Sequence, residues 1–202
     1  MRYDLHKTGP GAHAMNQDVL SRYERDAQNR FIIDIAAERP EALYNFFDKH
    51  ADYLRRDLDA ELTDYLTACT RELPGEVPLV IRFTFPAAQE EEKYARIRRS
   101  INSFFLYMAE LEREAIAQMM RKSGVLFFVG AAIMFLAVWV RQGFGEGASV
   151  VGDVFAEGLT VAAWVSLWEA LALVLLEWLP RRRNVRRFER LAAAEVQFRQ
   201  RD

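Results

Sequence analysis

Residues 124–140 read GVLFFVGAAIMFLAVWV, a run of 17 residues without a charged side chain. As an α-helix this run is roughly 25 Å long, which is at the short end of what crosses the hydrocarbon core of a bilayer. Arg121 and Lys122 precede the run and Arg141 follows it. Their long side chains can extend toward the headgroups and make up the missing length. The run therefore predicts a first membrane span.

A second apolar run, residues 158–179, reads GLTVAAWVSLWEALALVLLEWL and is roughly 33 Å long as a helix. Trp178 lies near its end and is followed by Pro180 and three arginines at 181–183. An aromatic residue, a helix-stopping proline and a basic cluster are typical of the cytoplasmic end of a span. We therefore expect a second span that ends at Pro180.

Lys and Arg residues near the span ends predict the orientation. The residues before the first span include Arg113, Arg121 and Lys122, whereas the connection 141–157 carries only Arg141. Six arginines follow the second span, at 181–183, 186, 187 and 190. By the positive-inside rule both termini are expected in the cytoplasm and the connection in the periplasm. Residues 1–30 contain no signal-peptide pattern, and the lone Cys69 fits a reducing compartment.

The composition of the whole chain conceals this segregation. The 202 residues are 51% hydrophobic and 28% charged, with a formal net charge of -2. The charge is -3 over residues 1–123, -4 over 124–180 and +5 over 181–202. These figures exclude collagen-like, disordered and disulfide-rich classes, and the small net charge argues against a nucleic-acid partner.

The part before the first span predicts a flexible tail at 1–15 and a small cytoplasmic α+β domain at 16–88. Residues 30–36 and 78–86 show the alternation of strands, and helices are expected at 40–47 and 57–73. Two strands alone are marginally stable. The sheet should be completed by helix packing or by a second copy of the chain.

A long helix is expected over residues 89–123, because no Pro or Gly interrupts the stretch before the first span. Its apolar residues alternate spacings of three and four, which is typical of a coiled-coil seam. Packing of the helix on its own domain explains the same pattern equally well. The seam residues are Ile97, Ile101, Phe104, Met108 and Leu111.

The segment 180–202 places apolar residues at helical intervals under a basic face. We expect an interfacial helix held by anionic lipid headgroups, in preference to a helix folded back on the cytoplasmic domain. The predicted basic rim is Arg121, Lys122, Arg181, Arg182, Arg183, Arg186 and Arg187.

Glu169 lies in the middle of the second predicted span, where an ionisable residue suggests function. Ser166 and Glu169 share a helical face, with Glu177 beside them, and tryptophans lie on the opposite side. Three roles remain open: a protonated carboxyl that bonds neighbouring helices, a cation or proton path in an oligomer, or an ion pair with another subunit. The first is favoured.

No enzyme is predicted, and neither a metal nor a cofactor. The sequence contains no nucleophile elbow, P-loop or zinc-protease motif. Cys69 lies on the apolar face of the expected helix 57–73, which is typical of an inert core thiol.

The chain resembles a family of uncharacterised bacterial two-pass membrane proteins. The resemblance covers roughly residues 30–198 and is most specific at WVSLWEA (164–170) and EWLP (177–180) followed by basic residues. It implies a bacterial inner-membrane protein with an N-terminal cytoplasmic domain, and it implies no activity. Members often carry Arg-Pro at the positions of Glu169 and Ala170, which weakens the conduction hypothesis.

The sequence thus predicts a mainly α membrane protein with spans at about 124–140 and 158–179. We expect a non-enzymatic interaction or scaffold subunit that assembles through its long helix and its spans, as a homo-oligomer or with another membrane protein. A homo-oligomeric ion channel and a membrane-anchored sensor are the alternatives.

Overall fold

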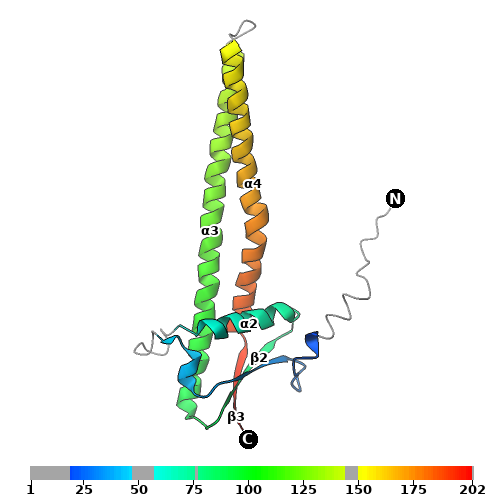
Figure 1. Cartoon of the computed structure of the whole chain (residues 1–202), viewed down its shortest axis with the longest axis vertical. Coiled ribbons are helices and arrows are strands. Elements are labelled where there is room, and N and C mark those ends of the chain that lie inside the picture. Colours follow the sequence, from blue (N-terminus) through cyan, green and yellow to red (C-terminus); the bar gives the residue numbers. More distant parts are fainter. Residues whose placement is uncertain (1–18, 47–56, 76, 144–149, 202) are drawn as a thin grey trace, which may run out of the picture. The chain divides into compact units, whose positions relative to one another are not determined.

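The computed structural model describes residues 19–46, 57–75, 77–143 and 150–201. The chain divides into two compact units (Figure 1). One, here called the α/β unit, contains the chain up to Ala109 and again from Arg186 onward. The other, the hairpin unit, is the intervening stretch Glu110–Val185. The α/β unit is therefore discontinuous in sequence.

The α/β unit contains a three-stranded parallel sheet in the order β1-β2-β3. Its strands are β1 (Phe31–Ala36), β2 (Leu79–Phe85) and β3 (Glu195–Gln200). The first two confirm the predicted strands to within a residue at each end. A third strand, which comes from the far end of the sequence, extends the sheet, and helix packing covers it as expected.

The connection between β1 and β2 contains the 3-10 helix η1 (Pro40–Leu43) and helix α2 (Ala60–Glu72). A crossover of this kind is what parallel pairing requires. Both helices are shorter than predicted. Helix α2 starts after Asp59, because its carboxylate accepts hydrogen bonds from the backbone N–H groups of Glu61 (2.9 Å) and Leu62 (3.3 Å).

Helix α3 (Glu91–Gly143) begins in the α/β unit, and its first turns pack on the apolar face of the sheet. Ile97, Ile101 and Phe105 are buried there against strand residues such as Ile81 and Phe83. Of the predicted seam, Ile97 and Ile101 are in this core, Phe104 and Met108 pack partly buried against it, and Leu111 is exposed in the hairpin unit. The seam pattern therefore reflects packing of the helix on its own domain.

The segment 180–202 does not form the single amphipathic helix that was predicted. Its first part is the end of helix α4 (Val150–Ala192), and its second part is β3. Phe188 and Leu191 are buried in the core of the α/β unit. Arg190 donates hydrogen bonds to the carbonyl oxygens of Leu73 (3.4 Å) and Val77 (2.6 Å), and burial lowers its pKa. The segment folds back on the domain because its apolar side chains complete that core.

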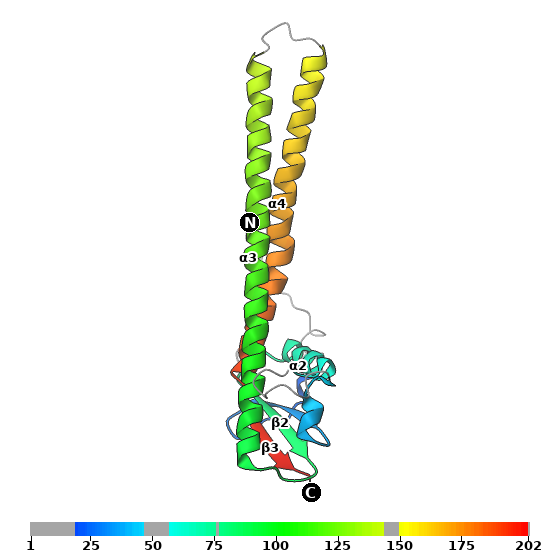
Figure 2. The same ribbon diagram turned by 90° about the vertical axis from the view of Figure 1, so that its left-hand side faces the viewer.

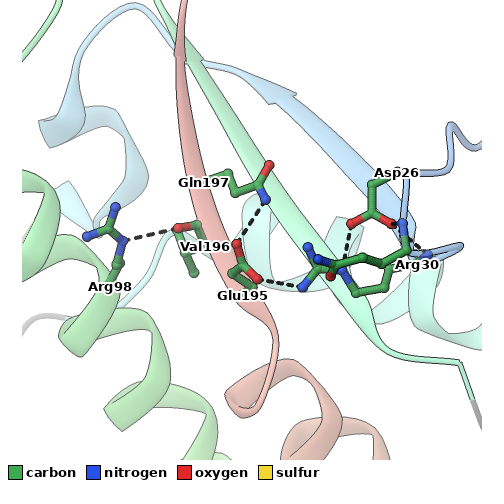
Figure 3. Close-up of polar contacts among 7 residues, drawn as sticks. Asp26, Arg30, Arg98, Glu195, Val196 and Gln197 are labelled. Atoms are coloured by element: carbon green, nitrogen blue, oxygen red, sulfur yellow. Dashed lines mark hydrogen bonds and ion pairs between the residues drawn. The ribbon is translucent and has the colours of Figure 1, made fainter.

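Polar contacts hold β3 on both sides (Figure 3). Arg98 of α3 donates from Nε to the carbonyl oxygen of Val196 (3.1 Å). Arg30, at the start of β1, pairs with both Asp26 and Glu195, and Gln197 donates to Glu195. Hydrogen bonds from Gln197 and Arg30 lower the pKa of Glu195. Partial burial acts to raise the pKa of Asp26, but hydrogen bonds from Arg30 and Gln28 lower it overall.

In the hairpin unit, α3 and α4 lie side by side along their length (Figures 1 and 2). The long uninterrupted α3 confirms the prediction of one helix that continues into the first apolar run. The helices reach further than predicted, to Gly143 and from Val150, so most of the expected connection 141–157 is helical. Residues 144–149 lie outside the described residues, as does the tail predicted at 1–15. Pro180 lies inside α4 and does not end it.

Candidate functional site

The outer surface of the hairpin is the most unusual feature of the molecule. Two of its helical stretches are long and apolar enough to cross a membrane by length and composition. In the most apolar 18-residue stretch of each helix, only 17% (α3) and 11% (α4) is buried within the protein. Phe128, Phe135 and Leu176 are each more than 70% exposed. A core helix of a soluble protein would bury most of such side chains.

The contact between the two helices is made by small residues. On α3, Ser123, Gly130 and Ala137 are buried at intervals of seven residues. On α4, the buried residues Ala156, Ala163 and Ala170 repeat the same interval. Small side chains allow two helix backbones to approach closely, as is common between helices in membranes.

The two helices approach closely at Gly130. A Cβ atom added there would lie 3.0 Å from Cγ of Leu167, 3.1 Å from Cβ of Ser166 and 3.2 Å from the carbonyl oxygen of Ala163. These distances are shorter than ordinary van der Waals contact, so only glycine fits without a shift of the neighbouring helix.

One buried hydrogen bond joins the helices at this contact. The hydroxyl group of Ser123 donates to the carbonyl oxygen of Ala170 at 2.8 Å. A polar group that is satisfied in this way can lie inside an apolar contact without a desolvation penalty. The bond fixes the register of one helix against the other.

The hairpin has one broad face on either side of the small-residue contact. The residues of each face are assigned from the helical rotation of about 100° per residue. One face, here called the aromatic face, lies on the side of Phe127 and Phe135 of α3 and of Trp164, Trp168 and Trp178 of α4. The opposite face, here called the Glu169 face, is formed by Val129, Leu136, Ala162, Glu169 and Leu173. A hollow of about 520 Å³ supports this assignment, since its lining residues fall on the aromatic side of both helices, among them Met134 and Val138 of α3 with Glu157 and Thr160 of α4.

The three residues of the predicted polar face have different surroundings. The hydroxyl of Ser166 donates to the carbonyl oxygen of Ala162 at 3.0 Å, within its own helix. Glu177 lies 3.8 Å from Arg181 in an ion pair one turn away. Glu169 is exposed on the outside of the hairpin, and Ala170 beside it makes the contact with α3. Glu169 is therefore directed away from the partner helix of its own chain.

The basic rim is divided between the two units. Arg121, Lys122, Arg182 and Arg183 are exposed in the hairpin unit. Arg181 is paired with Glu112 (3.4 Å), which also accepts a hydrogen bond from Asn184 (3.2 Å). The guanidinium of Arg182 lies over the ring of Trp178, 5.0 Å from its centroid. Arg186 and Arg187 belong to the α/β unit.

Two hollows of the α/β unit could hold a small ligand, and no group of metal-binding side chains is found among the residues that the structure describes. A groove of about 670 Å³ runs between α3 and β3, beside Arg98 and Asn102. A hollow of about 380 Å³ lies beside β1 and α2 and is lined by Tyr23, Asp34, Tyr65, Cys69 and Glu72, among others. The hydroxyl of Tyr23 donates to Glu72 at 2.7 Å, and burial together with hydrogen bonds to Cys69 and Glu72 raises the pKa of Tyr23. Cys69 is buried, as expected for a core thiol.

Comparison of the chain with protein-family models, curated proteins and solved structures found no match. The resemblance to two-pass bacterial membrane proteins therefore stays a prediction. Function has to be inferred from the surfaces described above.

The sequence interpretation missed the residues that join the helices. Their signal was present, because small residues recur every seventh position from 123 to 137 and from 156 to 170. An interval of seven keeps residues on nearly one side of a helix. The recurrence of small residues in and beside the two apolar runs therefore indicates the contact.

Proposed function

We propose that the protein is a non-enzymatic subunit that is anchored in a lipid bilayer by its helical hairpin and presents the α/β unit to partners at the membrane surface. The observation that carries this proposal is the exposed apolar surface of the hairpin. At about 25 cal/mol per Å² of apolar surface removed from water, a bilayer is a far better solvent for such helices than the cytosol.

The topology of the α/β unit supports the placement of both ends of the hairpin on the same side of the membrane. Its core contains the start of α3 and the end of α4, so the chain leaves this unit and returns to it. A compact unit lies on one side of a bilayer. With the exposed basic residues Arg121, Lys122, Arg182 and Arg183 at the same end of the hairpin, the positive-inside rule favours the cytoplasmic side of a bacterial inner membrane.

Extraction and labelling of the full chain test the anchor. In a Cys69→Ala background, Asp153→Cys is at the far end of the hairpin and Arg96→Cys is in the α/β unit. We expect both variants to resist alkaline carbonate extraction from membranes. A membrane-impermeant maleimide added to intact cells should label Asp153→Cys and leave Arg96→Cys unlabelled. Release of the protein by carbonate, or the reverse labelling pattern, would refute the proposal.

A ligand sensor is the second candidate function, because the hollow beside β1 combines polar and apolar lining residues. Its volume of about 380 Å³ is near the lower end of the range for small-molecule sites. A small molecule that raises the melting temperature of the detergent-solubilised chain, with the effect lost in Ala68→Phe, would support this function. Ala68 lines the hollow, so the larger ring should fill it.

A further inference from the structure

The Glu169 face of the hairpin carries a carboxyl group that has no hydrogen-bonding partner among the residues that the structure describes. Glu169 is exposed near the middle of the apolar stretch 158–179. In hydrocarbon an isolated carboxylate is costly, whereas a carboxyl group that is hydrogen-bonded to a partner is tolerated. A lipid tail offers no such partner. The face therefore needs a protein surface that can bond a neutral carboxyl at this depth.

We propose that the Glu169 faces of two copies of this chain pack against each other, with the two Glu169 carboxyl groups bonded across the axis of a symmetric dimer. The proposal rests on the membrane anchor proposed above, because it requires both hairpins to be inserted in the same direction. Under that condition Glu169 of one copy is at the same depth as Glu169 of the other.

The chemistry of the face favours a second copy as the occupant. A protonated carboxyl has one O–H donor and retains acceptor oxygens, so two such groups satisfy each other. The runs 124–140 and 158–179 contain no Lys, Arg or His that could form an ion pair with Glu169. A twofold interface places the same residue on both sides, and a neutral carboxyl is self-complementary in that arrangement.

The shape of the face is also suited to close packing. Gly158, Ala162 and Ser166 are spaced by four residues and lead along α4 toward Glu169. A Cβ atom added at Gly158 would meet nothing within 4 Å, so this end of the row is not used inside the chain, whereas Ser166 at its other end lies close to Gly130 of α3. Rows of this kind allow helices of different chains to approach closely. The bulky tryptophans of α4 are on the aromatic face, which is left to the lipid.

Paired cysteine variants test which face meets the second copy. Leu173 and Leu171 are two residues apart on α4 and about 160° apart around it, on the Glu169 face and the aromatic face respectively. In the full-length Cys69→Ala chain in phosphatidylethanolamine–phosphatidylglycerol vesicles, we expect oxidation to convert Leu173→Cys to a covalent dimer. The matched variant Leu171→Cys should stay largely monomeric. Equal cross-linking of the two, or stronger cross-linking of Leu171→Cys, overturns the proposal.

Substitution of Glu169 tests the bond itself. Energy transfer between labelled chains, followed as lipid dilutes the protein, measures the dissociation constant. Glu169→Leu should weaken association roughly 3- to 20-fold, the range of hydrogen bonds between membrane helices. Glu169→Gln should retain most of it, because an amide also donates and accepts. Glu157→Gln, on the aromatic side, is the control and should have no effect.

Unchanged association of Glu169→Leu overturns the proposal, and so does a parent chain that stays monomeric, as expected if a different protein covers the face. Either result in a chain that resists carbonate extraction leaves the membrane anchor intact. Failure of the extraction and labelling experiment would instead remove the anchor on which the dimer depends.

Discussion

Helix α3 passes through both units, and the two halves of the same helix place opposite kinds of side chain against their neighbours. In the α/β unit its inward residues are large, as with Ile101 and Phe105, which are at most 1% exposed. In the hairpin unit Met119 is buried as well, but along the apolar stretch beyond it the inward residues are Ser123, Gly130 and Ala137, while Phe128 and Phe135 are directed outward.

The difference shows that the surroundings of a helix decide which side chains it buries. In water, large apolar side chains are driven inward because burial removes them from solvent. Between helices that are surrounded by lipid this force is absent, and close backbone packing by small residues takes its place. One continuous helix that follows both rules is what the proposed membrane anchor requires.

The largest effect is expected when a large inward residue of the α/β unit is truncated. Phe105→Ala should destabilise this unit by about 3–5 kcal/mol, since the buried ring leaves a cavity. Phe128→Ala, on the same helix but 74% exposed, should leave it unchanged. Hydrogen exchange of the α2 amides measures both. Equal protection in the two variants would contradict the comparison.

A smaller but opposite pair of effects is expected from one substitution at two glycines of α3. Gly130→Ala should destabilise the hairpin by about 1–2 kcal/mol, because the added methyl group overpacks the contact with α4. Gly124→Ala meets nothing within 4 Å and should stabilise the helix by up to about 1 kcal/mol. All four tryptophans are in the hairpin unit, so their fluorescence during thermal unfolding reports on it. A change in hairpin stability of the same sign in both variants would refute this account.

The hydrogen bond between the helices should contribute less. Ser123→Ala removes the donor to the Ala170 carbonyl and is expected to cost about 0.6–1.7 kcal/mol in tryptophan-monitored unfolding. Ser166→Ala removes a bond within one helix and serves as the control. A cost as large for Ser166→Ala would show that the register does not depend on the bond between helices.

The smallest effect is a dependence on pH that is confined to the α/β unit. The folded-state pKa values of Asp26 and Glu195 are lowered, so their contribution to stability is fully present above about pH 4.3. It is lost as the pH falls through the lowered values. Asp26→Asn and Glu195→Gln should each weaken the acid dependence of α2 amide exchange. The tryptophan signal of the hairpin should be the same in both variants at every pH, and a change there would contradict the separation of the two units.

Much of this fold could be predicted from patterns of short range. The alternation in residues 78–86 is a local signal for β2, and the absence of Pro and Gly from 89 to 123 was sufficient for the first half of α3. The two long apolar runs were visible in the same way. Each of these features depends on neighbours in the sequence, which a single chain displays directly.

The features that were missed depend on partners far away in the chain. Val196 and Phe198 alternate like strand residues, but they follow a long helix and pair with β2, more than 100 residues earlier. Pro180 predicted a helix end, yet α4 continues because its last turns are held in the core of the α/β unit. The seam at Ile97 and Ile101 has the same spacing whether a sheet or a second helix covers it, so only the fold could distinguish them.

The sequence identified Glu169 as an ionisable residue in the middle of the second apolar run. The structure adds that its side chain is directed away from α3. A helical wheel of α4 alone does not show which side faces α3, because the deciding contact is made by alanines at 156, 163 and 170. Once these are placed, Glu169 is on the outside. The proposed dimer is inferred from that position.

The late position of β3 in the sequence also has a consequence for biosynthesis. Residues 110–185 leave the ribosome before Glu195–Gln200 do, so the hairpin is complete while the sheet still lacks its third strand. Until then β2 has an open edge, and Ile81 and Phe83 lack the cover provided by Val196 and Phe198. If the hairpin is the membrane anchor proposed above, delivery of its two long helices to a membrane begins before the domain closes. A chain that is truncated before residue 195 should expose an adhesive strand edge at the membrane surface.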